Sequence, residues 1–210
     1  MTQISERRAQ TREKLADAAT EVFAERGILA ATVEEICESA GFTRGAFYSN
    51  FGSKDDLVIA LVERWKRVNL DHTIEILGLL AETDAEVSFD RLTDGVADLM
   101  LRLQPPTRTD ALLQAEIELY AARSPRFAQQ HRVLLDGLLR SVAELMRKAV
   151  LSVDFVWVIE ETEAAELFFM LHTYIASELL LTGSFDRAKL VRILKPLLQS
   201  LLLPRHPQED

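Results

Sequence analysis

Apolar residues recur along most of the chain at the three- and four-residue spacing of amphipathic helices, whereas the alternation typical of strands is scarce. The first such stripe shares one helical face and contains Leu15, Ala18, Ala19, Val22 and Phe23. It predicts a helix that begins near Thr11 or slightly earlier and is capped by Gly27. Similar stripes continue to the end of the chain, so the pattern predicts an all-α fold of about nine helices.

Two short helices with strong capping signals follow the first stripe. The sequence "TVEE" from Thr32 to Glu35 matches a capping box, in which the Thr hydroxyl and the Glu carboxylate each accept a backbone N–H. Gly41 is expected to end this second helix, and Thr43 is expected to cap a third. Short helices joined across Gly41-Phe42-Thr43 form a helix-turn-helix pattern.

Longer helices are predicted downstream, beginning with a fourth that Ser53 caps and that runs to roughly Leu79. The remaining helical stripes cover 89–103, 112–120, 127–150, 162–181 and 190–201. Pro196 predicts a kink or break in the last of them. The β-branched segment "VLSVDFVWVI", residues 150–159, is compatible with a strand, but no partner strand is visible in the sequence. We therefore interpret it as an apolar connector.

The third short helix has two distinct faces at 100° per residue. Phe47 and Phe51 share one face and are expected to bury against the preceding helix, whereas Gly45 and Ser49 point the opposite way. The exposed face is therefore small, polar and free of acidic residues. Such a face suits close approach to the floor of a major groove about 12 Å wide.

Several side chains around this face are candidate DNA contacts. Arg44 could reach a guanine edge or a phosphate, and the methyl group of Ala46 could touch a thymine methyl. The expected phosphate donors are Tyr48, Ser49 and Asn50. Helix N-termini bind phosphate through free N–H groups, and three of them are capped here by Thr32, Thr43 and Ser53. Lys54 adds a formal positive charge at the third.

The charge distribution leaves this segment nearly neutral in an acidic protein of net charge −9. Residues 1–67 hold 10 Lys/Arg and 11 Asp/Glu, and residues 68–210 hold 14 and 22, so the acidity lies downstream. Near the N-terminus a basic cluster, diluted by acids, is either solvated or a DNA-binding arm: Arg7, Arg8, Arg12 and Lys14.

The lone cysteine, Cys37, excludes an intrachain disulfide and a zinc site built on several thiolates, and we expect it to be buried. The N-terminus is polar, and no apolar run reaches the ~18–20 residues that span a bilayer. These features predict a cytoplasmic protein without a membrane partner, a metal or another cofactor.

Residues Thr32 to Leu57 resemble the signature of the TetR (tetracycline-repressor) family of bacterial transcriptional regulators. The pattern T-x-x-x-I-x-x-x-A-G-x-[ST]-x-G-x-x-Y-x-x-F-x-[ST]-K-x-x-L is met by Thr32, Ile36, Ala40, Gly41, Thr43, Gly45, Tyr48, Phe51, Ser53, Lys54 and Leu57. The resemblance implies a helix-turn-helix domain over 8–68, with the motif at about 31–50, and an effector-binding and dimerisation domain over 69–210. It also implies a homodimer on a near-palindromic operator and a small-molecule effector that releases DNA. By match to the motif, the DNA contacts are Thr32, Thr43, Arg44, Gly45, Ala46, Tyr48, Ser49, Asn50 and Lys54.

Three polar residues interrupt apolar stripes downstream, namely Glu116, His131 and His172. One interpretation places them on a cavity, where a few polar groups orient an apolar effector, and the other makes them members of intramolecular pairs. The remaining candidates for lining such a cavity, residue types that more often belong to a packed core, are Trp65, Phe89, Met100, Tyr120 and Phe168.

Two apolar helices at the end of the chain, at about 162–182 and 186–203, expose more apolar surface than one monomer is expected to cover. A four-helix dimer interface would cover it. The preferred hypothesis is a ligand-released repressor. The alternatives are an all-helical enzyme and an interaction scaffold acting on a hydrophobic ligand. No nucleophile–base motif supports catalysis, and none of the four His lies three residues after a Glu as a di-iron bundle would require.

Overall fold

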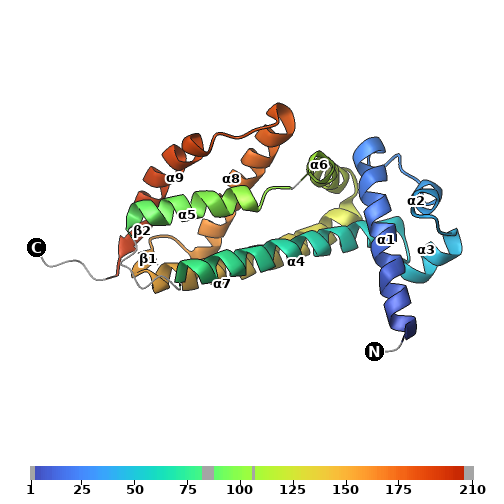
Figure 1. Cartoon of the computed structure of the whole chain (residues 1–210), viewed down its shortest axis with the longest axis horizontal. Helices are drawn as coiled ribbons and strands as arrows, with labels where there is room; N and C mark the ends of the chain where they lie inside the picture. The colour runs from blue at the N-terminus through green and yellow to red at the C-terminus, as the bar shows by residue number, and fades with distance from the viewer. Residues whose placement is uncertain (1–2, 82–87, 106, 206–210) are drawn as a thin grey trace, which may run out of the picture. The chain divides into compact units, whose positions relative to one another are not determined.

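The computed structural model describes residues 3–81, 88–105 and 107–205, and this part of the chain contains nine helices and one small sheet (Figure 1). The elements are α1 (Gln3–Arg26), α2 (Val33–Ala40), α3 (Arg44–Asn50), α4 (Lys54–Ala81), α5 (Phe89–Arg102), α6 (Arg108–Arg123), α7 (Pro125–Ser152), β1 (Phe155–Trp157), α8 (Glu161–Thr182), α9 (Arg187–Leu201) and β2 (Leu202–Pro204). The all-α fold predicted from the apolar periodicity is confirmed.

The chain divides into two compact units that do not follow chain order. The first unit holds residues 1–65 and 105–134, and the second holds 66–104 and 135–210. The first crossing, between Trp65 and Lys66, lies close to the predicted boundary at residue 68. Residues 105–134 belong to the first unit, whereas the predicted division placed them in the C-terminal domain.

The first unit is built around apolar residues of α1. Phe23 of α1, Ile36 of α2 and Phe47 of α3 are each fully buried in one cluster. α6 packs against α1 and adds Ile117 and Tyr120 to the same cluster. The helix-turn-helix pair therefore rests on a core that a helix from much later in the chain completes.

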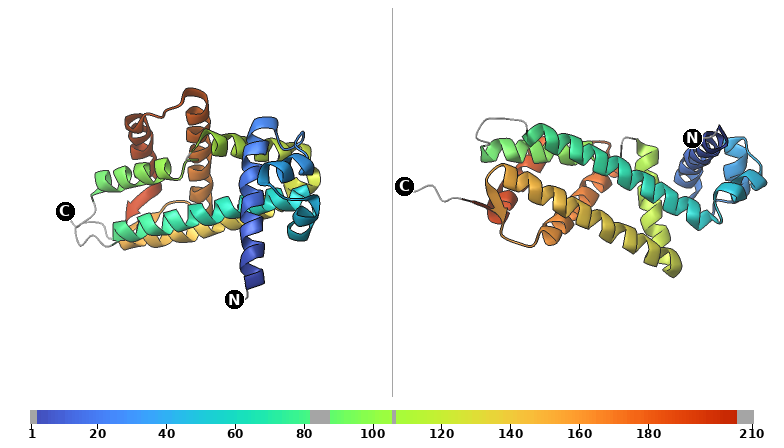
Figure 2. Two further views of the ribbon diagram at one scale, coloured as in Figure 1. Left: turned by 45° about the vertical axis from the view of Figure 1, so that its right-hand side comes forward. Right: turned by 90° about the horizontal axis from the view of Figure 1, so that it is seen from below.

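The second unit packs α5 against α9, which lie side by side (Figures 1 and 2). Leu190, Leu194 and Leu198 repeat every four residues along α9 and are buried with Ile175 of α8. Arg187 ties the start of α9 to α5, because its guanidinium pairs with the carboxylates of Asp94 at 2.9 Å and Asp98 at 2.7 Å.

Segment 150–159 contains a strand, so its interpretation as a simple connector was wrong. β1 pairs antiparallel with β2, with Val156 opposite Leu203. The partner strand is three residues long and directly follows α9, so it has too few residues to show strand periodicity in the sequence.

The predicted helix ends are largely confirmed. The capping box of Thr32 and Glu35 is present, and Gly41 ends α2 in the left-handed conformation at φ 70°. The Ser53 hydroxyl accepts the N–H of Asp56 at 3.1 Å at the start of α4. α1 is longer than predicted, however, and α9 continues through Pro196 without the break that proline predicted.

Within the described residues, α8 is the helix that meets the requirement for crossing a membrane by length and composition. Its apolar residues do not form one uninterrupted run, because Glu166 and Glu178 lie within the helix. Buried helices of proteins without a membrane segment meet the same requirement.

Candidate nucleic-acid interface

The turn between α2 and α3 is fixed by backbone and cap contacts. The N–H of Phe42 donates to the carbonyl of Cys37 at 2.9 Å, which completes the turn after Gly41. Thr43 then caps α3, because its hydroxyl accepts the N–H of Ala46 at 3.2 Å. Cys37 is buried as predicted, and burial raises the pKa of its thiol. These contacts fix the direction in which α3 leaves the turn.

α3 presents the two faces that its sequence predicts. Phe47 and Phe51 are 0% and 2% exposed, with ring centroids 5.7 Å apart. Gly45 and Ser49 are exposed on the other side, and Tyr48 is half exposed. The exposed face therefore carries small and hydroxyl side chains only.

Two of the predicted phosphate donors are engaged within α3 itself. The hydroxyl of Ser49 and the amide of Asn50 both donate to the carbonyl of Ala46 at 2.8 Å. Both are terminal groups on rotatable bonds, so a phosphate oxygen could replace this carbonyl as their acceptor. The phenol of Tyr48 packs beside Phe47, with ring centroids 5.3 Å apart in an edge-on arrangement.

Arg44, the first residue of α3, lies against Glu34 of α2. Arg44 Nη1 is 2.7 Å from Glu34 Oε1, and both side chains are more than half exposed. The guanidinium carbon also lies 5.9 Å from the centroid of the Tyr48 ring. Glu34 was not among the predicted site residues, because the motif pattern leaves its position open.

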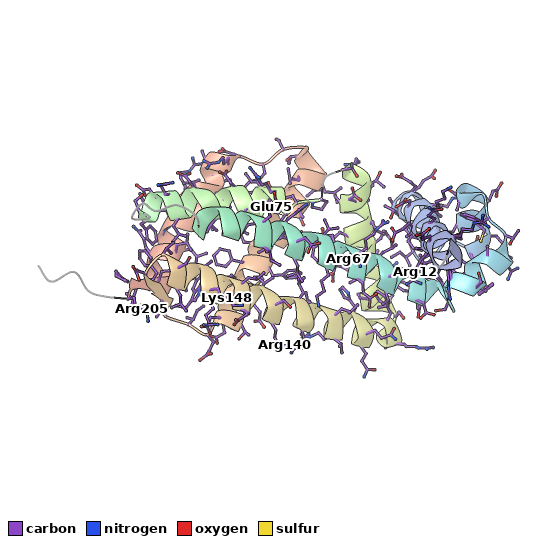
Figure 3. The ribbon with its side chains drawn as sticks, turned by 60° about the horizontal axis from the view of Figure 1, so that its bottom comes forward. Arg12, Arg67, Glu75, Arg140, Lys148 and Arg205 are labelled. Atoms are coloured by element: carbon purple, nitrogen blue, oxygen red, sulfur yellow. The ribbon has the colours of Figure 1, made fainter. Side chains whose placement is uncertain are left out.

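Two arginines of α1 hold the end of α3. Arg8 donates to the carbonyl of Ser49 at 3.0 Å, and Arg12 donates to that of Asn50 at 2.8 Å. Arg12 projects from α1 (Figure 3). Its guanidinium carbon also lies 4.3 Å from the centroid of the Phe51 ring. Cations at the C-terminal end of a helix are favoured by its dipole. In this structure both arginines therefore hold the C-terminal end of α3 in place. The sequence had suggested either a solvated terminus or a DNA-binding arm.

The comparisons with known proteins agree with this geometry. Residues 15–61 match the model of bacterial regulatory proteins of the tetR family. This match covers the second half of α1, all of α2 and α3, and the start of α4, which are the elements around the helix-turn-helix. The helix-turn-helix domain of this chain is therefore of the TetR type.

Similarity to individual curated proteins covers only part of the chain. The transcriptional regulator TtgR of Pseudomonas putida is 37% identical over 78 residues, which is 37% of this chain and 35% of TtgR. The transcriptional repressor AcnR of Corynebacterium efficiens is 30% identical over 135 residues, 62% of each chain. The chain thus matches about a third of TtgR and less than two thirds of AcnR.

The fold of the whole chain is also that of solved relatives. The crystal structure of the regulator FadR of Bacillus subtilis in complex with stearoyl-CoA has a TM-score of 0.65 at 20% identity. The similarity covers 89% of this chain and 96% of FadR. The similarity of fold therefore extends beyond the helix-turn-helix.

Lys54, one of the motif positions, points at the protein's own backbone. Its ammonium donates to the carbonyls of Ile28 at 2.6 Å, Leu29 at 3.3 Å and Ala31 at 2.8 Å. Burial lowers the pKa of this ammonium. Here the lysine closes the loop between α1 and α2 onto the start of α4, so the predicted phosphate contact would have to replace these bonds.

Two candidate effector residues of α6 contact the same region. Glu116 Oε2 accepts the N–H of Ile28 at 3.1 Å, and the Tyr120 hydroxyl donates to the carboxylate of Asp55. Burial, reinforced by the hydrogen bond to that carboxylate, raises the pKa of Tyr120 to about 12. Gly27, at φ +82°, leaves space for Glu116, because a Cβ there would lie 2.9 Å from Oε2. These contacts agree with the intramolecular interpretation of Glu116.

The two histidine candidates also have partners within their own units. His131 lies 3.1 Å from Glu118 Oε1 in the first unit. The Nε2 atom of His172 lies 3.1 Å from the carbonyl of Leu103 in the second, where burial lowers the His172 pKa.

The predicted effector residues are divided between the two units. Trp65, Glu116, Tyr120 and His131 belong to the first unit, and Phe89, Met100, Phe168 and His172 belong to the second. Phe89, Met100 and Phe168 pack in or against the apolar cluster of the second unit.

Proposed function

We propose that this TetR-family protein is a transcriptional regulator that binds operator DNA through α3 and acts as a repressor. The observation that carries the proposal is the exposed face of α3, which contains Gly45 and Ser49 and no acidic residue of α3. Phe47, on the opposite face, is buried and holds the helix against the core. A face of small side chains admits the helix deep into a major groove. Arg44 and Tyr48 flank this face as base and phosphate contacts.

The expected mode of binding follows from these positions. Arg44 lies at the first turn of α3, where recognition helices contact base edges. The hydroxyl groups of Thr32, Thr43, Tyr48 and Ser49 would meet phosphates on either side. Phosphate contacts of this kind position a protein without reading sequence.

Arg44 and Tyr48 provide the test of this assignment. We expect Arg44→Ala to relax base preference at one position per half-site by about 1–3 kcal/mol, because the lost contact is to a base edge. Tyr48→Phe should weaken binding to all sequences alike, since a phosphate carries no base identity. Gel shifts at several salt concentrations, with DNA flanking the protein's own gene, would measure both effects. The reverse pattern contradicts the assignment, and no salt-sensitive, sequence-specific shift with any fragment contradicts the function.

We propose further that the protein acts as a homodimer through α8 and α9. Support comes from apolar side chains exposed on one side of α8, with Met170 59%, Tyr174 41% and Leu181 79% exposed. A dimer that binds a near-palindromic operator needs its two α3 helices on half-sites about 34–36 Å apart.

Sedimentation tests the dimer. The wild-type protein should sediment as a dimer at micromolar concentration, and Met170→Glu should shift it toward monomer by placing a charge in the apolar interface. Val133→Glu on α7 is the matched control, because Val133 is 64% exposed and lies outside the proposed interface. A wild-type monomer at this concentration contradicts the proposal.

The effector is proposed to be a small molecule that binds within the second unit, whose buried core is apolar. The complex of FadR with stearoyl-CoA shows that one protein of this fold takes an acyl-chain ligand. α4 contributes residues to both units of this chain, so a ligand that prefers one orientation of α4 would change the spacing of the α3 helices. Its effect is limited to its differential affinity for the two states. A ligand that binds and leaves operator affinity unchanged contradicts this coupling.

A further inference from the structure

The ion pair between Glu34 and Arg44 lies on the proposed DNA-binding surface, and protein stability does not account for it. Both side chains are more than half exposed, and exposed ion pairs contribute little to folding. Glu34 is also not needed for the cap of α2, because Glu35 supplies the carboxylate of the capping box. The pair therefore requires another explanation.

A carboxylate at this position repels the DNA phosphates and weakens binding, unless it accepts hydrogen bonds from donors on the DNA bases. In the major groove the donors are the amino groups of cytosine and adenine, at N4 and N6. A guanine–cytosine pair presents two adjacent acceptors on guanine and one donor on cytosine. An arginine and a glutamate side by side present the complementary set, two donors from the guanidinium fork and one acceptor.

The geometry at the start of α3 matches this requirement. Arg44 Nη1 lies 2.7 Å from Glu34 Oε1, so this ion pair occupies one of the five N–H donors of the guanidinium. The remaining N–H groups are available to donate to guanine. The Tyr48 ring, 5.9 Å from the guanidinium carbon, limits the directions that Arg44 can take. Small neighbours at Gly45 and Ala46 leave the pair unobstructed from the DNA side.

We infer that Glu34 is a specificity-determining residue, which together with Arg44 selects a G·C base pair in each operator half-site. Arg44 donates to N7 and O6 of guanine, and Glu34 accepts from N4 of the cytosine in the same or the neighbouring pair. The ion pair orients both side chains before DNA arrives and cancels their net charge toward phosphates. This inference rests on the proposed function, because it requires α3 to enter the major groove.

Base-pair substitution combined with mutation tests the inference. The wild-type protein first selects its preferred site from a random pool of duplexes. Fluorescence anisotropy then measures the Kd for that site and for duplexes with each G·C pair replaced by A·T or inverted. We expect wild-type protein to discriminate at one G·C pair per half-site by about tenfold or more. Glu34→Ala and Arg44→Ala should each reduce that discrimination several-fold.

Glu38→Ala is the matched control, because Glu38 is an exposed carboxylate one turn later on α2 and its loss changes the net charge equally. This variant should keep the wild-type discrimination at the G·C pair. If Glu34→Ala instead tightens binding to every duplex as Glu38→Ala does, with base preference preserved, Glu34 only repels phosphate and the inference is overturned. If the wild-type protein selects no sequence from the pool, the proposed function fails first, before any variant is measured.

Discussion

Replacement of Phe47 by alanine is expected to destabilise the first unit by about 3–5 kcal/mol and to abolish sequence-specific DNA binding. The Phe47 ring is fully buried in the cluster that contains Phe23 of α1 and Ile36 of α2. α3 is only seven residues long and holds its position through this ring and that of Phe51. A cavity at this point removes the packing that keeps α3 at a fixed angle to α2.

Urea unfolding followed by circular dichroism would measure the loss of stability, and amide hydrogen exchange would locate it. Exchange should accelerate in residues 15–61. Leu29→Ala is a suitable control, because Leu29 is 52% exposed in the same unit and surface substitutions usually change stability by less than about 0.5 kcal/mol. A Phe47→Ala protein that keeps both its stability and its operator affinity would show that α3 is held by contacts other than its buried face.

The features predicted correctly from the sequence are those that depend on neighbouring residues. A capping box needs only Thr32 and Glu35, three positions apart, and a left-handed helix end needs only Gly41. The facing of Phe47 follows from the helical repeat alone. Local rules of this kind located the helix-turn-helix and its exposed face.

The features that the sequence did not reveal depend on residues far apart in the chain. Glu116 accepts the N–H of Ile28, 88 positions away, and Arg8 caps a carbonyl 41 positions away. A glutamate in an apolar stripe looks the same in the sequence whether it faces a ligand or a backbone amide. β1 was missed for the same reason, because its partner strand lies beyond α8 and α9 in the sequence.

The loop between α1 and α2 combines several of these long-range contacts. Lys54 donates to three of its carbonyls, and Glu116 accepts one of its N–H groups. Asp55, next to Lys54, accepts the hydroxyl of Tyr120. α4 and α6 thus hold the loop from which α2 begins, which makes Lys54 a structural residue in addition to a motif position.

Lys54→Met is therefore expected to cost about 1.5–3 kcal/mol of stability, because hydrogen bonds to a charged group are the stronger class and the methionine leaves part-buried carbonyls without a donor. Operator affinity should fall for all sequences alike, since the change disturbs the start of α2 and α4 and removes no base contact. Urea unfolding and anisotropy titrations over a range of salt concentrations would measure the two effects.

The salt dependence separates this role from a direct phosphate contact. A lysine that neutralises a phosphate contributes about one unit to the slope of log affinity against log salt, and its removal lowers that slope with little change in stability. A lysine that only holds the loop leaves the slope unchanged. Lys14→Met on the exposed side of α1 removes the same charge and should leave stability at the wild-type value. A reduced slope with unchanged stability for Lys54→Met would assign Lys54 to the DNA backbone, as the motif implies, and would show that the loop bonds seen here are exchanged for a phosphate on binding.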